Sequence, residues 1–247
     1  MRGILATYYR ELLVYKRRAL RYSLSSIVNP VLFLLAFGYG LSSLSLFNSN
    51  SYLRFMVPGL IAVSSMNQAY SISFDIHIAR LYTMTYQGLL VAPIERWEIL
   101  VGELLFAITK SLSPLIFFVV YLSFFPSLGL VLNIPFFISW LIHVLTWALI
   151  GVVIAFKIDS HADHATFTTF VVTPITFISD TFFPVSRLGG FFELIANFSP
   201  LTHTTRMIRY SMQSGFGLPF IIELGYSLIV LLIFAIFGII VLSRAER

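Results

Sequence analysis

Long apolar runs separated by short polar segments make up most of this chain. A helix of about 20 apolar residues crosses the hydrocarbon core of a bilayer, because each residue rises about 1.5 Å. The pattern therefore predicts an all-α integral membrane fold with six transmembrane helices, at residues 24–44, 55–74, 99–125, 136–156, 165–183 and 218–242. The span ends near Pro126 and Pro184 are left open.

The first 21 residues combine an apolar stripe with basic side chains. The stripe is spaced by three and four residues and consists of Leu5, Tyr8, Leu12, Tyr15 and Ala19. Another face carries Arg10, Arg17 and Arg21. This periodicity predicts an amphipathic helix over residues 1–21 that lies in the headgroup region of the membrane. A charged tail before the first span is the alternative.

Two further segments do not have the composition of transmembrane spans. Residues 75–98 are mixed in polarity and contain Pro93. Residues 184–217 are too polar and too rich in Gly and Pro for a lipid-exposed span, yet too apolar for a free loop. We predict two short helices there, at 188–198 and 202–212, broken at Ser199–Pro200. They would form an outer re-entrant hairpin packed against protein or an aqueous cavity.

Composition agrees with a membrane protein. The chain is 58% hydrophobic and 11% charged, whereas soluble domains carry about 25% charged residues. The absence of Cys excludes disulfides and thiolate chemistry. Of the 16 Lys and Arg residues, eleven fall in segments on one side of the predicted spans and four on the other. The positive-inside rule then places both termini in the cytoplasm. We expect no nucleic-acid binding, because little soluble chain remains to build a site.

Motifs for nucleotide binding or hydrolysis are missing. There is no phosphate loop, no H-E-x-x-H and no G-x-S-x-G pattern. We therefore expect no catalytic residue and no cofactor on this chain. If the chain takes part in an energy-driven process, another polypeptide must supply the energy. His161 and His164 lie one helical turn apart in the loop DSHADH. A capped polar loop explains them better than a metal site, so no metal is predicted.

Ionisable residues inside predicted spans are candidates for a transport path. Such groups usually face the bundle interior and pair with one another or line a path. The candidates are Glu103, Lys110 and Asp180. Glu103 and Glu223 lie close enough to span ends to reach water instead. Lys110 is near mid-span, and a structural ion pair and a transport role remain equally open for it.

Two stretches resemble a known family. Residues 83–103, TMTYQGLLVAPIERWEILVGE, and residues 171–209, VVTPITFISDTFFPVSRLGGFFELIANFSPLTHTTRMIR, are similar to segments of ABC-2 type exporter permeases. The resemblance covers roughly residues 1–240 and is strongest to the nodulation-type and capsule-type permeases. Two positions depart from the family pattern. Asp180 stands where many members have Gly, and Gly189–Gly190 stand where Leu-Pro is common.

The resemblance implies a partner ATPase. Family members pair two permease chains, here expected to be a homodimer, with two ATP-binding subunits that carry ATP and Mg. Residues 75–98 would be the cytoplasmic coupling segment within a single transmembrane domain, 1–247. The expected ATPase contacts are Tyr82, Tyr86, Gln87, Gly88, Leu89, Leu90 and Pro93. The expected outer hairpin, residues 184–217, includes Pro184, Pro200, Arg206 and Arg209.

Export is accordingly the expected function. The cargo would be a lipid-linked molecule, a glycolipid or polysaccharide, or a hydrophobic drug-like compound that leaves the cytoplasm or inner leaflet across the cell's inner (plasma) membrane. A channel or an ion-coupled carrier is the first alternative, although no internal repeat is visible. A membrane-embedded enzyme is the second. The only residues that could form its active site are scattered along the sequence, namely His143, Lys110 and Asp180. An importer would carry a Glu-Ala-Ala pattern that is missing here.

Overall fold

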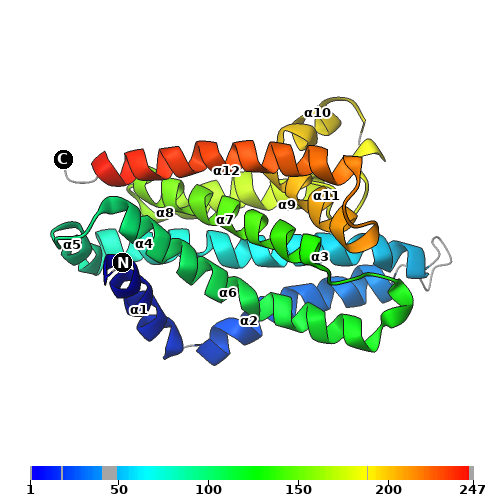
Figure 1. Ribbon diagram of the computed structural model, residues 1–247, viewed down its shortest axis with the longest axis horizontal. Coiled ribbons are helices and arrows are strands. Elements are labelled where there is room, and N and C mark those ends of the chain that lie inside the picture. Colours follow the sequence, from blue (N-terminus) through cyan, green and yellow to red (C-terminus); the bar gives the residue numbers. More distant parts are fainter. Residues whose placement is uncertain (1, 18, 41–48, 188, 245–247) are drawn as a thin grey trace.

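The structure is a computed structural model that describes residues 2–17, 19–40, 49–187 and 189–244. Throughout these ranges the regular elements are helices. The long helices run side by side, with α5 and both termini at one end, the α5 end, and α10 at the other, the α10 end (Figure 1). The helices are α1 (Arg2–Lys16), α2 (Ala19–Phe33), α3 (Ser49–Tyr70), α4 (Ile72–Leu81), α5 (Thr85–Leu90), α6 (Arg96–Phe124), α7 (Ile134–Lys157), α8 (His161–Phe167), α9 (Thr173–Ile178), α10 (Gly190–Phe198), α11 (Pro200–Gln213) and α12 (Leu218–Arg244).

Short π- and 3-10 turns complete the helical elements. Two π-helical turns continue longer helices, namely η1 (Leu34–Gly40) after α2 and η4 (Thr168–Val172) between α8 and α9. The 3-10 turns are η3 (Pro126–Leu128) and η5 (Val185–Arg187). π-turns are rare and concentrate at functional sites. The predicted first and fifth spans, which contain them, are therefore candidate functional segments.

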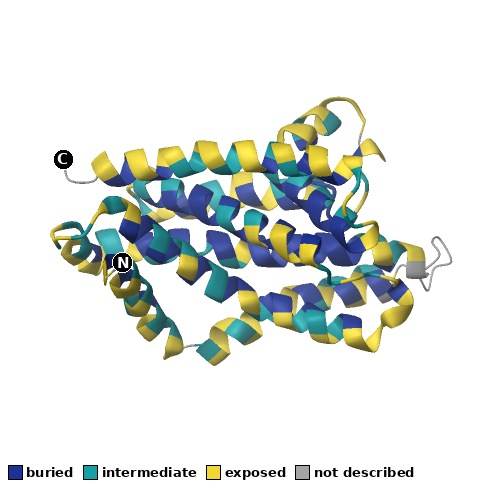
Figure 2. Ribbon diagram, viewed as in Figure 1, coloured by how far each residue is buried: buried dark blue, intermediate teal, exposed yellow. Residues whose placement is uncertain are grey.

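Within the described residues, four helical segments are long and apolar enough to cross a membrane: Ala19–Gly38, Arg96–Phe124, Ile134–Lys157 and Leu218–Arg244. The last three agree with the predicted third, fourth and sixth spans to within three residues. Helix α12 is exposed along much of its outer side (Figure 2), where isoleucines such as Ile221, Ile229 and Ile236 face outward. Apolar side chains on that scale suit lipid as the neighbour. The chain is an all-α membrane protein.

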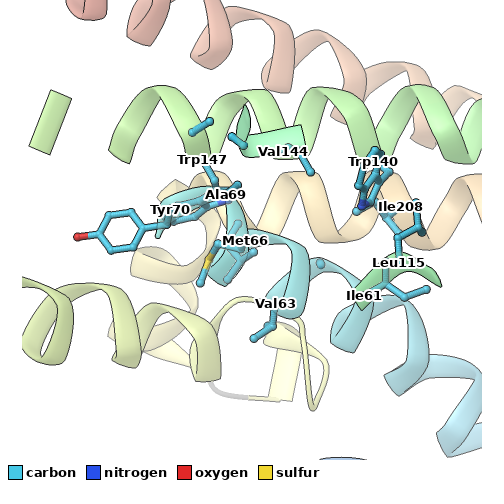
Figure 3. Packing of buried hydrophobic residues seen from close by; sticks show 14 of the residues in the cluster. Ile61, Val63, Met66, Ala69, Tyr70, Leu115, Trp140, Val144, Trp147 and Ile208 are labelled. Carbon is cyan, nitrogen blue, oxygen red and sulfur yellow. The ribbon is translucent and has the colours of Figure 1, made fainter. Parts of the chain in front are cut away.

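Helix α3 lies at the centre of the bundle. It packs against α2, α6, α7 and α11, and Met56, Leu60, Ile61 and Met66 are fully buried or nearly so. Figure 3 shows Met66 beside the α7 residues Val144 and Trp147. A helix enclosed by protein has no need for a uniformly apolar surface, which explains why α3 is absent from the four apolar segments. The predicted span, residues 55–74, lies within a longer helical path that α3 begins at Ser49 and α4 continues to Leu81.

The predicted fifth span is shorter than expected. Helices α8, η4 and α9 form one helical stretch from His161 that ends at Ile178 rather than at residue 183. The helix stops because Asp180 adopts a left-handed backbone conformation, with φ of 60°, which a continuing right-handed helix does not contain. The following residues turn back toward α3, where the hydroxyl of Tyr52 donates to the carbonyl of Phe182 at 3.0 Å.

Helix α1 corrects the predicted N-terminal face. It ends at Lys16, so the expected helix over residues 1–21 is too long, and α2 already begins at Ala19. It runs steeply across the α5 end of the bundle (Figure 1) and packs on α6. The buried face is Gly3, Thr7 and Glu11, whereas Leu5 is 64% exposed. Thr7 and Glu11 thus face protein, while the predicted apolar stripe is divided: Leu5 faces outward, and Tyr8 and Tyr15 are half-buried against the core.

The segment before the last span is a helical pair, with the break at the predicted place. Helix α10 ends at Phe198, and the Ser199 hydroxyl accepts from the backbone N–H of Leu201 at 3.3 Å to cap α11. Pro200 occupies the first turn, where it needs no hydrogen-bond partner. The two helices differ in surroundings. Helix α11 is enclosed by α3, α7 and α12, while Phe191 and Phe198 of α10 are 70% and 74% exposed.

Candidate functional site

The predicted coupling segment, residues 75–98, includes the end of α4, all of α5 and the start of α6, at the α5 end of the bundle. Helix α5 follows a turn at Met84, whose φ is 54°, and α6 begins after Glu95 in a capping box with Glu98. Of the seven predicted contact residues, Tyr82, Gln87, Gly88 and Pro93 are exposed, and Leu89 and Leu90 are half-buried. Residues from Gln87 through Arg96 surround an open hollow of about 800 Å³.

The structure differs from the expected docking face at Tyr86. Its side chain is fully buried, so in this conformation it is not part of a surface that a partner could touch. The ring packs edge-on against Phe156 of α7, with centroids 5.6 Å apart, and lies under the Arg10 guanidinium at 5.1 Å. Burial raises the pKa of the Tyr86 hydroxyl, followed by the field of Glu103. Tyr86 therefore joins α5 to α1 and α7 inside the chain.

Five charged residues gather beneath α5, and we call them the inner ion cluster: Arg10, Glu11, Asp75, Glu103 and Lys110. Arg10 contacts both Glu11 and Glu103, with 3.4 Å between its Nη2 and Glu103 Oε1. Burial raises the pKa of Glu11, and Arg10 opposes that rise. The cluster borders a cavity of about 360 Å³ between α1, α4 and α6.

Lys110 is engaged in an ion pair. Its Nζ lies 2.6 Å from Oδ2 of Asp75 on α4, and the rings of Tyr22 and Phe106 lie within 6 Å of it. Of the two interpretations left open for Lys110, the structure contains the ion pair. Glu103 is 1% exposed, so it does not reach water as a residue near a span end would. The prediction that Glu103 and Lys110 line a transport path stays a prediction.

A second charged group lies at the α10 end, and we call it the outer ion cluster: Asp180, Arg206, Arg209, His203 and Glu223. Asp180 Oδ2 lies 2.6 Å from Nη1 of Arg209 and 3.3 Å from Nε of Arg206. The other carboxylate oxygen accepts from the backbone N–H of Val185 at 2.8 Å. Asp180 thus holds α11 against the turn after α9, instead of standing free at a mouth.

The remaining intramembrane candidates are also paired. Oε2 of Glu223, on α12, lies 2.5 Å from Nδ1 of His203 on α11, so Glu223 has a protein partner rather than only water. His143 is fully buried in α7. Its Nε2 lies 2.8 Å from the carbonyl of Ala62, and its Nδ1 lies 2.8 Å from the hydroxyl of Thr204. His143 therefore ties together α3, α7 and α11.

A cleft of about 320 Å³ runs between α2, α3 and the η4–α9 stretch. Its walls carry no charged residue among those described. They combine hydroxyl and amide side chains with aromatic rings, among them Asn29, Asn67, Gln68, Thr176, Phe33 and Phe177. The π-helical turn η4 contributes Thr168 and Val172 to this cleft. Neutral hydrogen-bonding groups beside aromatic faces can hold an uncharged polar ligand and an apolar one together.

The sequence matches the ABC-2 type transporter family over residues 2–213. That range includes the coupling segment, the inner ion cluster and the cleft, and all of the outer ion cluster except Glu223. The chain belongs to the ABC-2 type transporter family.

Relatives of this ABC-2 type chain include a nodulation protein and two proteins named as transport permeases. It is 30% identical over 224 residues to nodulation protein J of Rhizobium leguminosarum bv. viciae, which covers 84% of this chain and 81% of that protein. It is 24% identical over 230 residues to the inner membrane transport permease YadH of Escherichia coli strain K12, with 88% and 87% covered. A putative transport permease, ycf38 of Cyanophora paradoxa, is 26% identical over 247 residues, with 90% and 81% covered.

The two departures from the ABC-2 pattern now have a backbone explanation. Asp180 has φ of 60°, which favours Gly and which Asp tolerates better than most residues. The substitution therefore keeps the turn and adds a carboxylate that binds Arg209. Gly189 and Gly190 have φ of 66° and 51°. Pro cannot adopt a positive φ, so the chain enters α10 differently from members with Leu-Pro.

Some residues of this ABC-2 site were missed by sequence reasoning. Arg10 and Glu11 fall in the predicted interfacial helix and Asp75 in the predicted coupling segment, and all three complete the inner ion cluster. The clearest available signal was the charge of Glu103 and Lys110 themselves, which demanded partners from other segments. Nothing in the local sequence around Asp75 indicates that its partner lies 35 residues away.

Proposed function

We propose that this chain is the membrane permease subunit of an ATP-driven exporter. Two copies would form a homodimer, and each would bind one ATP-binding subunit that carries ATP and Mg. The observation that carries the proposal is α5, a short exposed helix beside an open hollow at one end of the bundle. A surface-exposed helix next to a hollow is a shape that a partner's groove and side chains can engage. ATP hydrolysis would occur on that partner.

The proposed topology has six spans within one transmembrane domain. They comprise the four apolar segments, the enclosed helix α3 and the helical stretch 165–178. Both termini lie at the α5 end (Figure 1), so one side of the inner (plasma) membrane, the cytoplasm, holds the termini and α5. The excess of Lys and Arg near that end supports this orientation. The pair α10–α11 would be the re-entrant outer element.

Tyr86 supports a mechanical role for α5. A push on α5 would reach Arg10 of α1 and Phe156 of α7, because the buried Tyr86 ring contacts both. Arg10 in turn contacts Glu103 of α6. Packed contacts of this kind transmit displacement as rigid-body movement of helices. The permease pair would then alternate between states open to either side of the membrane.

The uncharged cleft supports the proposed cargo class. Its Asn, Gln, Ser and Thr side chains suit the hydroxyls of a sugar, and its Phe rings suit a lipid chain or a sugar face. We propose a glycolipid, a lipid-linked saccharide or an uncharged hydrophobic compound as cargo. The cleft lies on α2, α3 and α9, so a second copy seated on this face would close it into a shared path.

Gly88→Trp should weaken binding of the ATP-binding subunit by about tenfold or more, which is 1.4 kcal/mol at least. A Cβ at Gly88 would meet no atom of this chain within 4 Å, so the bulky ring disturbs only a docked partner. Val91→Asp, at a side chain that is 84% exposed, should act in the same direction. The measurement is co-purification of the permease in nanodiscs with its co-expressed ATP-binding subunit, quantified against wild type.

Gly225→Trp is the matched control. Gly225 lies on α12, and a Cβ there also meets nothing within 4 Å, but it is remote from α5. This variant should retain the partner fully. The proposal fails if wild-type chain does not form a stable complex with an ATP-binding subunit, or if Gly88→Trp and Gly225→Trp retain it equally.

A further inference from the structure

Three of the chain's five histidines meet where α4 packs beside α8. We call His77, His161 and His164 the histidine cluster. The ring centroid of His77 lies 5.2 Å from that of His164 and 6.1 Å from that of His161. Tyr82, which leads toward α5, lies 6.2 Å from His77 and 6.0 Å from His161. Imidazoles from two separate helices therefore share one site, and His77 itself lies within the predicted coupling segment, residues 75–98.

Two of these imidazoles are buried with unused nitrogens. His77 and His164 are each 0% exposed. Neither ring nitrogen of His77 has a hydrogen-bond partner in the described part of the chain, and Nδ1 of His164 also lacks one. Nε2 of His164 lies 2.5 Å from the Ser73 hydroxyl, and the Phe74 ring lies 4.0 Å from its own. Apart from the carbonyls of Ala155 and Ile158 near His77, these surroundings offer little to stabilise a positive charge and suit neutral rings.

The charged groups around the cluster are committed elsewhere or turned outward. On α4, Asp75 pairs with Lys110 of α6, and Arg80 binds the Ala155 carbonyl at 2.5 Å and Asp159 at 3.3 Å. From the end of α7 and from α8, the exposed groups are Lys157, Asp159 and Asp163. Helix α5 contains no charged residue. Among the described residues, no carboxylate forms an ion pair with any of the three imidazoles.

No group of three or more His, Asp or Glu in the described ranges has an arrangement that could hold a metal ion. All three imidazole rings can bind a proton, and each then carries a positive charge. A second positive charge within about 6 Å of the first, in a site without a carboxylate, is repelled strongly because little water screens it.

We infer that the histidine cluster is a proton-sensitive latch, which holds α8 against α4 while its imidazoles are neutral and releases α8 on mild acidification. Release would free the end of α4 that leads through Tyr82 into α5. The latch itself is a property of this fold. Only its consequence, a change in communication with an ATP-binding subunit, rests on the proposed function.

The pH window follows from the direction of the shifts. Burial lowers the pKa of His164 to about 4, with His77 and His161 adding to the effect. Burial also lowers the pKa of His77, followed by His161 and Arg80, and the nearby carbonyls of Ala155 and Ile158 only partly oppose it. An opened site would bind protons near the ordinary pKa of about 6.5. The latched state is therefore favoured at neutral pH and loses stability as the pH falls from about 6.5 toward 4.

The size of the effect is bounded for one imidazole. With a pKa of about 4 when latched and about 6.5 when open, His164 alone changes the ratio of latched to open molecules by at most about tenfold between pH 7.5 and 5.5. Partial hydration of the site reduces this value. His77 acts in the same direction, so both histidines contribute to one transition.

A spin-label distance measurement tests the latch. The chain contains no Cys, so Gly88→Cys and Ala162→Cys place a unique label pair on α5 and α8, both at exposed positions. In nanodiscs without any ATPase, the distance distribution should shift or broaden reversibly between pH 7.5 and 5.5. The His77→Gln, His161→Gln, His164→Gln triple variant should show one distribution at both values. His203→Gln, which alters the outer ion cluster instead, should keep the response.

The proposal is overturned if the parent pair shows no pH response, if the triple variant still responds, or if His203→Gln abolishes the response. Nitrogen-15 NMR of histidine rings provides a second measurement that needs no stable triple variant. Single His→Gln changes assign the signals, and His77 and His164 should titrate below pH 6.5, over the same pH range as the change in label distance. Titration of both near 6.5 rejects the latch. Because neither measurement contains an ATPase, failure here leaves the Gly88→Trp result to decide the proposed function separately.

Discussion

Asp180→Ala should lower the free energy of unfolding by about 3–5 kcal/mol. Removing one partner of a buried ion pair leaves the other charge uncompensated, and costs of that size follow. Arg209 would be left in a site where its side chain is 8% exposed, and its remaining partners among the described residues would be the carbonyls of Asp180 and Phe55 and the Phe55 ring. Ala is also less suited than Asp to a φ of 60°, which adds about 1 kcal/mol. Reversible unfolding in mixed micelles, followed by tryptophan fluorescence, measures the difference.

Two further substitutions separate the causes. Asp180→Asn keeps the tolerance for a left-handed backbone and an oxygen that can accept from Val185, so it removes mainly the charge and should cost less than Ala. Arg206→Gln removes the more exposed cation, whose side chain is 23% exposed, and should cost under about 1 kcal/mol. An Asp180→Ala protein as stable as wild type would show that the outer ion cluster contributes no stability. Equal losses for Asp180→Asn and Arg206→Gln would contradict the assigned geometry.

Gly59→Ala should destabilise the protein by about 2 kcal/mol or more, although Ala favours a helix by about 1 kcal/mol over Gly. A Cβ at Gly59 would lie 2.2 Å from the carbonyl oxygen of Thr181 and 2.9 Å from its Cα. That loop cannot easily retreat, because Tyr52 holds Phe182 and the Phe182 ring packs against Phe33 with centroids 4.8 Å apart. The added methyl must therefore push α3 away from the turn. The same micelle unfolding experiment measures the loss.

Gly225→Ala is the control for Gly59→Ala. It makes the same chemical change in a helix, at a position where the new Cβ has open space, so it should be neutral or slightly stabilising. If both variants behave alike, the close approach of α3 to Thr181 is not a constraint on this fold. A loss of stability confined to Gly59→Ala would also be accompanied by a disturbance of the uncharged cleft, because Leu60 and Phe182 line that cleft.

Sequence patterns located the elements whose signals are local. The break at Ser199–Pro200 was predicted because a proline restricts the residue before it, and α6, α7 and α12 followed from long apolar runs. The extent of α3–α4 was not predictable in this way. Protein surrounds that helix, so its polar residues carry no boundary signal. The end of α9 at Ile178 depends on the backbone at Asp180, which the apolar run 181–183 conceals.

The helices that carry the candidate residues were predictable, but the pairing of those residues was not. The segment containing α5 was located, yet Tyr86 was placed on the wrong side of it. Its ring enters the chain because Arg10 and Phe156 provide a pocket, and both come from distant segments. The Lys110–Asp75 pair and the convergence of His77 with His164 likewise depend on packing between helices. Single-sequence periodicity gives the face of a helix but not which neighbour occupies it.

The enclosed position of α3 has a consequence for biogenesis. A translocon releases a segment sideways into lipid according to that segment's own apolarity, and α3 (Ser49–Tyr70) lacks the apolarity of its neighbours. In the proposed topology, α3 would insert poorly into lipid on its own when it leaves the translocon, shortly after α2. It would enter the bilayer stably only once α6 and α7 are synthesised and can shield its polar positions. Nascent chains arrested before α6 should therefore be the form most exposed to quality-control proteases.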